Sequence, residues 1–251
     1  MKNEAWQSIF DKYGVGDFDF SKSPFTLTAS QIKEATTHFK KTTQKEVRIL
    51  CKQDTRESRP TVFIENDLFL LPIKNGTFAI VKGEGYVDIP SIDSTQEIYN
   101  SKLTFDLDSS KVGNSEMQHL DYAYASSLIR TFLNDNSLVL TIRGRKYTPE
   151  FSFKVGNQDI KVSGVQTEVD AGYEGEDKIV LIEAKNSSTK NTIIRQLFYP
   201  FRQWSKFTNK KVITLFFEKR NLEYLFWKFE FGDSNEYNSI ILTDSKKFII
   251  K

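Results

Sequence analysis

Sulfur-containing residues and histidine are scarce in this chain. Its 251 residues include one cysteine, two histidines and two methionines. The single cysteine, Cys51, has no partner for an internal disulfide, which is typical of proteins from a reducing compartment. With only His38 and His119 and no cysteine pair, the chain lacks the ligand pattern of a structural zinc site.

Long apolar runs and a large net charge are also missing. No run approaches the roughly 20 apolar residues that cross a bilayer, and the first ten residues lack the apolar core of a signal peptide. We therefore predict no membrane association and an intracellular, prokaryotic cytoplasmic location. The net charge of +2 does not by itself indicate a nucleic-acid partner. A chain of this length can bury a sizeable core in one large domain or two small ones.

The distribution of charge is more informative than its sum. Nine basic residues and a single acid, Glu218, lie between Lys185 and Arg220. A local excess of this kind suits the binding of phosphate groups. The alternative is an ordinary solvated basic surface.

Residues 165–185 show the clearest local pattern. Residues 165–170 alternate between β-branched and polar side chains, and residues 178–185 form an apolar run that ends in Glu-Ala-Lys. Both patterns predict strands. With residues 175–177 as the turn, the two strands form an antiparallel hairpin.

This hairpin would gather charged side chains on one face. The register places Asp170 opposite Glu183 and Glu168 opposite Lys185, and opposed residues point to the same face. Two opposed carboxylates repel each other, and a divalent cation between them removes the conflict. The pattern therefore indicates a metal site rather than a purely structural sheet.

Asp170, followed at a distance by Glu183-Ala184-Lys185 at the end of an apolar strand, resembles the signature of the PD-(D/E)XK nuclease superfamily, and in particular type II restriction endonucleases. Val169 stands where the motif has a proline, a position that varies in this superfamily. The resemblance implies an α/β (α+β) fold with a central mixed β-sheet flanked by helices, preceded by an N-terminal α+β part.

The resemblance assigns roles to residues of the hairpin. Asp170, Glu183 and the backbone carbonyl of Ala184 would hold Mg²⁺, with Mn²⁺ as a substitute, since hard cations prefer oxygen ligands. Lys185 would sit beside the attacking water and stabilise the transition state. Glu168 would either join these acids or support the site as a cross-strand partner of Lys185, and we favour the supporting role.

Two helices next to the hairpin add candidates. Glu116 follows Ser115, a candidate N-cap, and resembles the acidic residue that many of these enzymes carry on the preceding helix, where it helps to bind the metal. The alternative is an interaction with the helix dipole. After the hairpin, Gln196 and Tyr199 resemble the Gln-and-Tyr-bearing helix of a subset of the superfamily. We expect both to support the site.

Candidate DNA contacts are the polar and basic side chains in three segments. The alternative for the first segment is an ordinary charged loop. Such side chains hold phosphates or read base edges. They are Lys52, Gln53, Arg56 and Arg59, then Arg143 and Arg145, and finally Arg195, Arg202 and Lys206.

Periodicity predicts the remaining elements. We expect helices over residues 3–13, over a segment capped by Thr28 or Ser30, and over about five turns from Ser115, and we expect Pro200 to bend or break the helix that contains it. Strands are expected at residues 46–52, 61–64, 67–73, 77–83 and 103–107, and residues 222–231 are expected to form an edge strand or an interface. A domain boundary near 110 would separate an N-terminal DNA-binding region, 1–110, from a catalytic domain, 111–251.

The resulting hypothesis is a metal-dependent endonuclease that hydrolyses double-stranded DNA, as type II restriction enzymes do. By resemblance, a homodimer and a cognate DNA methyltransferase are expected as partners. Two alternatives stay open: a repair, resolvase or mobile-element nuclease of the same superfamily, and a non-catalytic DNA-binding or protein-interaction module.

Overall fold

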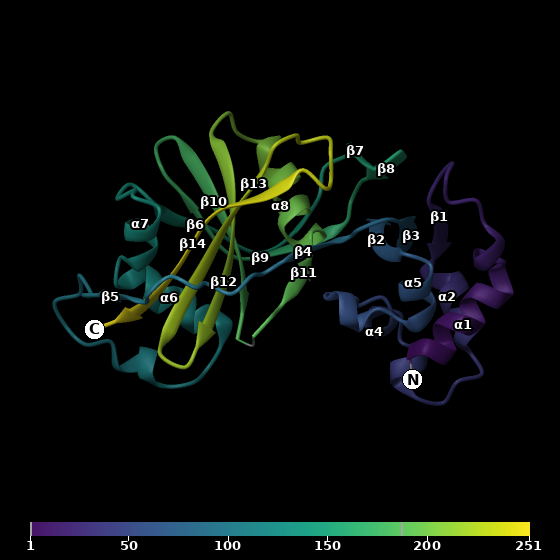
Figure 1. The fold of residues 1–251 in the computed structure, drawn as a ribbon, viewed down its shortest axis with the longest axis horizontal. Coiled ribbons are helices and arrows are strands. Elements are labelled where there is room, and N and C mark those ends of the chain that lie inside the picture. The colour runs from purple at the N-terminus through teal and green to yellow at the C-terminus, as the bar shows by residue number, and fades with distance from the viewer. Residues whose placement is uncertain (1, 187) are drawn as a thin grey trace.

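The computed structural model describes residues 2–186 and 188–251, which form two groups of elements side by side along the long axis of the molecule (Figure 1). We call residues 2–82 the N-terminal unit and the rest of the described chain, from residue 86, the sheet unit. The N-terminal unit contains α1 (Lys2–Tyr13), η1 (Val15–Asp17), β1 (Phe25–Thr28), α2 (Ala29–Thr36), α3 (Thr42–Lys45), α4 (Val47–Leu50), η2 (Arg56–Ser58), α5 (Thr61–Glu65), β2 (Leu68–Lys74) and β3 (Thr77–Lys82).

The N-terminal unit encloses a core of its own. Trp6, Ile9 and Phe10 recur at helical spacing in α1 and are buried, as predicted. They pack with apolar side chains from α2, α5 and the three-stranded antiparallel sheet β1-β3-β2. Thr28 caps α2: the amide of Gln31 donates to Thr28 Oγ1 at 3.2 Å, and the Gln31 side chain accepts from the Thr28 amide at 2.8 Å.

Two strand predictions for the N-terminal unit are wrong. Residues 46–52 contain the helical turn α4, and residues 61–64 belong to α5. A run of about four apolar residues fits either a strand or a buried helical turn, and packing decides between them. Here Leu50 and Phe63 face the same core as Trp6, and Trp6 Nε1 donates to the carbonyl of Leu50 at 3.2 Å.

The sheet unit is built on a seven-stranded mixed sheet with the order β5-β14-β13-β12-β10-β9-β6. The pairs β10–β12 and β14–β5 are parallel and the others are antiparallel. The predicted central mixed sheet with flanking helices is thus confirmed at the level of an α+β fold. The strands are β5 (Glu97–Tyr99), β6 (Val139–Tyr147), β9 (Gln166–Glu174), β10 (Lys178–Lys185), β12 (Lys211–Arg220), β13 (Glu223–Phe231) and β14 (Ile240–Ile250).

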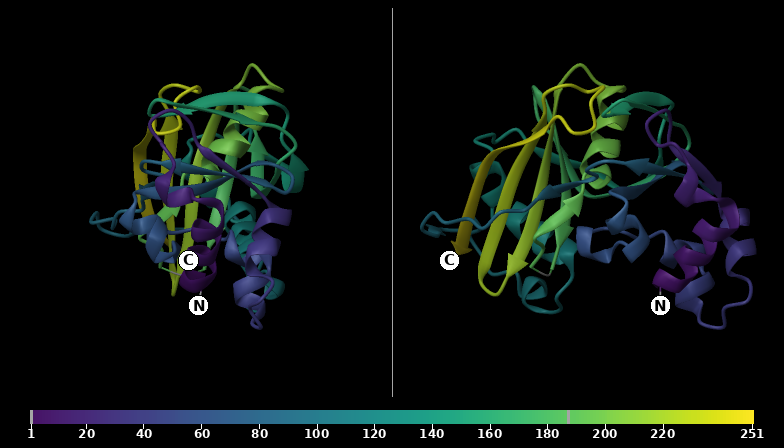
Figure 2. Two further views of the ribbon diagram at one scale, coloured as in Figure 1. Left: turned by 90° about the vertical axis from the view of Figure 1, so that its right-hand side faces the viewer. Right: turned by 45° about the vertical axis from the view of Figure 1, so that its right-hand side comes forward.

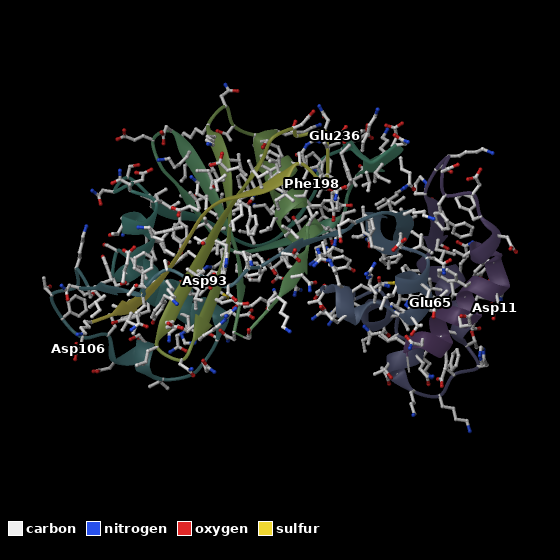
Figure 3. All side chains as sticks on the ribbon, in the orientation of Figure 1. Asp11, Glu65, Asp93, Asp106, Phe198 and Glu236 are labelled. Carbon is white, nitrogen blue, oxygen red and sulfur yellow. The ribbon has the colours of Figure 1, made fainter. Side chains whose placement is uncertain are left out.

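Helices cover both faces of this sheet (Figure 2). On one face, α6 (Glu116–Ala125) and α7 (Leu128–Phe132) pack against β9, β10, β12 and β13. On the other, α8 (Arg195–Ser205) lies in the connection between the parallel strands β10 and β12, which need such a crossover. Phe198 of α8 lies in the interior, whereas the exposed Asp11 and Asp106 lie at the periphery (Figure 3).

Short strands connect the sheet unit to the N-terminal unit. β4 (Tyr86–Asp88) pairs antiparallel with β11 (Asn191–Ile193), and β7 (Phe151–Val155) pairs with β8 (Gln158–Val162). Their apolar residues pack with β2, β3 and α8 in one cluster that spans the two units. From β4 the chain crosses the sheet unit to β5 at the far edge (Figure 1). The domain boundary near residue 110 stays a prediction, although β4 and β5 pair with strands of the C-terminal part.

Several expectations for the sheet unit are corrected. The helix of about five turns is divided into α6 and α7 by Ser127, which has a left-handed conformation with φ of 68°. Residues 103–107 form no strand, and η3 (Asp108–Lys111) follows them. β13 lies between β12 and β14, so it is not an edge strand. Pro200 does not break α8, because the helix buries its apolar face against the sheet and this offsets the lost hydrogen bond. In the described residues, no helix combines the length and the apolar character needed to cross a bilayer.

Candidate active site

The hairpin of β9 and β10 has the predicted register. Leu181 pairs with Gly172 and Ile182 with Ala171, and the same offset carried one step further relates Glu183 to Asp170. Beyond Ile182 the two strands are joined through a side chain: the backbone amide of Ala184 donates to Asp170 Oδ2 at 2.7 Å. A close approach of β6 requires the glycine at position 172, since a Cβ there would lie 2.7 Å from Cβ of Ile142.

Glu183 is the centre of the polar contacts on this hairpin. It is 8% exposed, and its Oε1 accepts a hydrogen bond from Lys185 Nζ, two residues along the same strand. The same oxygen accepts a second bond from Gln196 Nε2 on α8, at 2.6 Å. The end of β10 supplies the carboxylate and the ammonium group, and the start of α8 supplies the amide that meets them.

Glu116 approaches the same end of β10 from α6. Ser115 caps the helix by accepting from the Gln118 amide at 3.2 Å, and Glu116 Oε1 accepts from the Asn186 amide at 3.2 Å. The charge of Glu116 acts on both Asp170 and Lys185. The structure therefore places the four predicted catalytic residues, Glu116, Asp170, Glu183 and Lys185, around the end of β10.

Burial dominates the electrostatics of the two carboxyl groups. It raises the pKa of Glu183 from 4.5 to about 7, against the opposing effect of Lys185 and with a further contribution from Asp170. Burial also raises the pKa of Asp170, although the Ala184 amide and Lys185 act in the other direction. For Lys185, burial lowers the pKa, but the acids Glu183, Asp170 and Glu116 together leave the pKa raised. A shift of this size in a carboxyl group is typical of functional sites.

Two predicted supporting residues do not make the expected contacts. Glu168 is exposed, and its Oε2 accepts from Arg145 Nε at 3.2 Å, so it is not the partner of Lys185. It does line a cavity with Glu183 and Gln196, and its charge acts on Asp170. Tyr199 is fully buried, and its hydroxyl donates to the carbonyl of Pro72 at 3.0 Å. Its ring packs edge-on against Phe151. Tyr199 therefore belongs to the core that joins the two units, and Gln196 alone of the predicted pair reaches the site.

Several predicted DNA contacts are engaged inside the protein. Arg202 is buried and donates to the carbonyls of Ser152 and Ser234, so its expected role in binding DNA is corrected to a packing role. Arg59 donates to the carbonyl of Leu68 at 3.0 Å and stacks on the ring of Tyr86. Arginine side chains that bridge separate segments in this way stabilise the fold.

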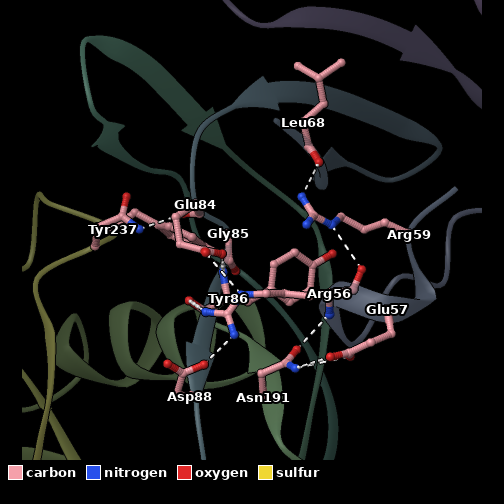
Figure 4. A network of polar contacts seen from close by, with 11 residues as sticks. Arg56, Glu57, Arg59, Leu68, Glu84, Gly85, Tyr86, Asp88, Asn191 and Tyr237 are labelled. Atoms are coloured by element: carbon pink, nitrogen blue, oxygen red, sulfur yellow. Dashed lines mark hydrogen bonds and ion pairs between the residues drawn. The ribbon is translucent and has the colours of Figure 1, made fainter. Parts of the chain in front are cut away.

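Arg56 and Gln53 also lie at the junction between the units. Arg56 forms ion pairs with Glu84 and Asp88, and with Arg59 it lies in the polar network of Figure 4. Gln53 is 2% exposed, with neither amide atom hydrogen-bonded among the described residues. The sequence alone could not place the Arg56 side chain, because its partners Glu84 and Asp88 are distant in the chain.

The other basic candidates retain accessible surface. The side chains of Lys52 and Arg145 are 71% and 63% exposed, and Lys206 is exposed while it donates to the carbonyl of Glu150. Arg143 is paired with Asp121 and its charge acts on Tyr173 and Asp170. Arg195 lies 4.0 Å from Asp54, between the N-terminal unit and the site.

The donor set suits a hard cation, although it is sparse. In residues 2–186 and 188–251, no three His, Cys, Asp or Glu side chains are gathered closely enough to form a metal cluster by themselves. Among the hydrogen bonds of this part of the chain, Asp170 accepts at Oδ2 and Glu183 at Oε1, which leaves Oδ1 and Oε2 available. Two carboxylate oxygens supplemented by a carbonyl and water are ligands that Mg²⁺ accepts.

Sequence reasoning missed three residues of the site region. Asn186 contacts Glu116, Thr192 contacts Gln196, and Asn191 connects the segment after β10 to the N-terminal unit. They lie in the polar stretch that follows Lys185, which has no periodicity. The only feature of this stretch that could have indicated a role in the site is its position between β10, the proposed catalytic strand, and α8, the helix that carries Gln196.

A sheet with helices on both faces, and a buried acid next to a half-buried amide and lysine at one strand end, define an α+β protein with a candidate functional site. Residues 3–80 match the family model described as Domain of unknown function (DUF6996), and residues 81–249 match the one described as Domain of unknown function (DUF6997). The second match covers more than half of the chain, which therefore belongs to the DUF6997 family. No curated protein and no solved structure matches the chain.

Proposed function

We propose that this protein is a metal-dependent endonuclease that hydrolyses phosphodiester bonds in double-stranded DNA, with a restriction-endonuclease-like catalytic fold. One observation carries the proposal. Glu183 is buried beside Lys185 and Gln196, at the strand end that Asp170 and Glu116 approach from neighbouring elements. A structural sheet has little reason to keep so many charges at one buried strand end, because each costs desolvation energy.

The residues of the site divide the chemical work. Asp170 and Glu183, with the carbonyl of Ala184, would hold Mg²⁺ or Mn²⁺. The bound ion would neutralise phosphate oxygens and lower the pKa of a water molecule. Lys185 would place a positive charge beside the reacting phosphate, where the negative charge of the transition state grows. Gln196 keeps Glu183 oriented through its hydrogen bond to Oε1.

The DNA would be held by cations that remain accessible. Lys52, Arg145 and Lys206 are exposed, so each can contact a phosphate group of the backbone. We propose that these residues, rather than the buried Arg202, contribute to DNA binding. The proposed substrate would be met in a prokaryotic cytoplasm.

If the protein is a type II restriction enzyme, two partners are expected for it. Cleavage of both strands of a duplex commonly uses two copies of such a site, so a homodimer is part of the proposal. A DNA methyltransferase that modifies the same sequence is the other. Cuts at one defined sequence would support this reading, and cuts directed by DNA structure would favour a repair, resolvase or mobile-element nuclease.

Plasmid cleavage tests the proposal. Purified protein is incubated with supercoiled DNA and Mg²⁺, beside the variants Asp170→Asn and Lys185→Ala. Each should lower the cleavage rate by about 100-fold or more, since Asp170 would hold the metal ion and Lys185 would stabilise the negative charge of the transition state. Lys161→Ala is the matched control, because this lysine is 66% exposed on β8 and pairs with Glu150.

Calorimetry separates a nuclease from a binding module. Mg²⁺ titrated into the protein should release or absorb heat, and Asp170→Asn should weaken the binding. Retained cleavage in both variants would refute the site. DNA binding without cleavage and without Mg²⁺ binding would support the non-catalytic module instead.

A further inference from the structure

The side-chain amide of Gln196 is fixed at both of its atoms. Thr192 Oγ1 donates to Gln196 Oε1 at 2.8 Å, and Gln196 Nε2 donates to Glu183 Oε1 at 2.6 Å. If the amide were turned over, its oxygen would face the carboxylate oxygen of Glu183, and two acceptors would oppose each other. The carboxylate of Glu183, which only accepts, therefore sets the orientation of the amide, and the hydroxyl of Thr192, a residue that is 1% exposed, holds the amide oxygen in place from the other side.

Thr192 is the central residue of β11, and the N-terminal unit holds this strand from one side (Figure 4). Asn191 is 3% exposed; its Oδ1 accepts from the Arg56 amide at 2.7 Å, and its Nδ2 donates to both carboxylate oxygens of Glu57, at 2.9 and 3.1 Å. The Ile193 amide donates to the carbonyl of Asp54 at 2.9 Å. These contacts join positions more than a hundred residues apart.

The other contacts of the strand come from the segment that follows the N-terminal unit. β11 pairs with β4 in the register Thr192↔Val87, and the Ile194 amide donates to the carbonyl of Gly85 at 3.0 Å. β11 thus depends on partners outside the β9–β10 hairpin. Its position sets where α8 begins, and with it the position of Gln196.

We propose that Thr192 is a positioning residue for Glu183, acting through Gln196, and that the N-terminal unit maintains this arrangement by holding β11 through Glu57 and Asp54. The proposal deepens the proposed function and rests on it, since Glu183 is the residue being positioned. It also gives the N-terminal unit a second role besides binding DNA: it completes the support of the site.

The hydroxyl can be removed without a change in shape. Thr192→Val keeps the volume and loses the donor, whereas Thr192→Ser keeps the donor. Loss of a group that orients a metal-binding side chain typically lowers activity by about 10- to 100-fold. We expect the valine variant to lose that much in single-turnover cleavage at saturating plasmid with unchanged DNA affinity, and the serine variant to stay within about 3-fold of wild type.

A matched control accounts for the loss of a buried hydroxyl as such. Thr36 is fully buried in the N-terminal unit, and its hydroxyl donates to the carbonyl of Ile32 at 2.8 Å. Thr36→Val should therefore lower stability to a similar degree and leave the single-turnover rate unchanged. Equal rates for Thr192→Val and wild type, or an equal loss in Thr36→Val, would overturn the assignment of Thr192.

The contribution of the N-terminal unit is tested at Glu57. Glu57→Ala removes the acceptor for Asn191 Nδ2, and Glu57→Gln retains an acceptor oxygen. We expect the alanine variant to reproduce part of the loss seen in Thr192→Val and the glutamine variant to restore it. A Glu57→Ala variant with the wild-type cleavage rate and the wild-type exchange rate of the Gln196 side-chain amide would overturn the role of the N-terminal unit.

A spectroscopic readout keeps the inference separate from the proposed activity. The side-chain NH₂ of Gln196, identified by its disappearance in Gln196→Met, should exchange slowly with solvent because it is bonded to a buried carboxylate. Thr192→Val and Glu57→Ala should accelerate this exchange, and Thr36→Val should not. Absence of cleavage by wild type would defeat the proposed function alone; unchanged exchange in Thr192→Val would defeat the positioning role alone.

Discussion

The raised pKa of Glu183 makes a quantitative prediction about stability. Burial raises this pKa from 4.5 to about 7 in the folded protein, while the unfolded chain retains the ordinary value. Between these two pH values the folded protein holds a proton that the unfolded chain has released. The free energy of unfolding should therefore fall as pH rises through this window.

The size of the effect follows from the shift. One pKa unit corresponds to 1.36 kcal/mol, so the shift at Glu183 amounts to a loss of about 3 kcal/mol between pH 4.5 and 7. Glu183→Gln removes the titrating group and keeps an oxygen that accepts from Lys185 and Gln196. The difference in stability between variant and wild type should shift by about 3 kcal/mol in favour of the variant over this window.

Urea denaturation in the presence of a chelator, at several pH values from about 4.5 to about 8, measures this difference. Glu150→Gln is the control, because Glu150 is an exposed carboxylate at the surface of the same unit. Parallel pH profiles for wild type and Glu183→Gln would refute the reasoning. Added Mg²⁺ should flatten the wild-type profile, since the ion binds the ionised carboxylate, and should leave the profile of the variant unchanged.

Four further substitutions test the structural assignments. Arg202→Met should lower the free energy of unfolding by about 2 to 3 kcal/mol in urea denaturation and leave DNA affinity unchanged. Lys206→Ala should leave stability unchanged and reduce the salt dependence of DNA binding by about one phosphate contact. The reverse pattern would contradict the burial of Arg202. Gly172→Ala should cost about 1 to 3 kcal/mol by thermal melting, because the added methyl group meets β6, and an unchanged melting temperature would count against this packing. Arg220→Gln should cost about 3 to 5 kcal/mol, because it leaves the fully buried Glu218 without its ion-pair partner; a stability within experimental error of wild type would show that water compensates Glu218.

The local elements of the site were predictable from periodicity and turn chemistry. Alternation in residues 165–170 and the apolar run before Glu183 specify two strands, and the short turn between them allows one antiparallel register. The capping of α6 by Ser115 and the apolar stripe of α8 are similarly local. These features depend on residues within one or two turns of each other.

The burial of individual polar side chains was not predictable in the same way. Tyr199 and Arg202 lie on the same helix as Gln196, and their chemistry suits a site equally well. Tyr199 and Arg202 donate hydrogen bonds to backbone carbonyls of β2 and β7, whereas Gln196 donates to the carboxylate of Glu183. Which partner a side chain meets depends on which strands pack against each part of the helix.

The sequence by itself determined the hairpin register, the caps and the acidic and basic residues available to the site, because strand pairing and helix capping are short-range interactions. The tertiary structure decided which of those residues meet. It placed Gln196 on Glu183 and assigned β11 to the junction with the N-terminal unit, through contacts that join residues 54–57 to residues 191–193. Such contacts form only when the whole chain has packed, so no local pattern encodes them.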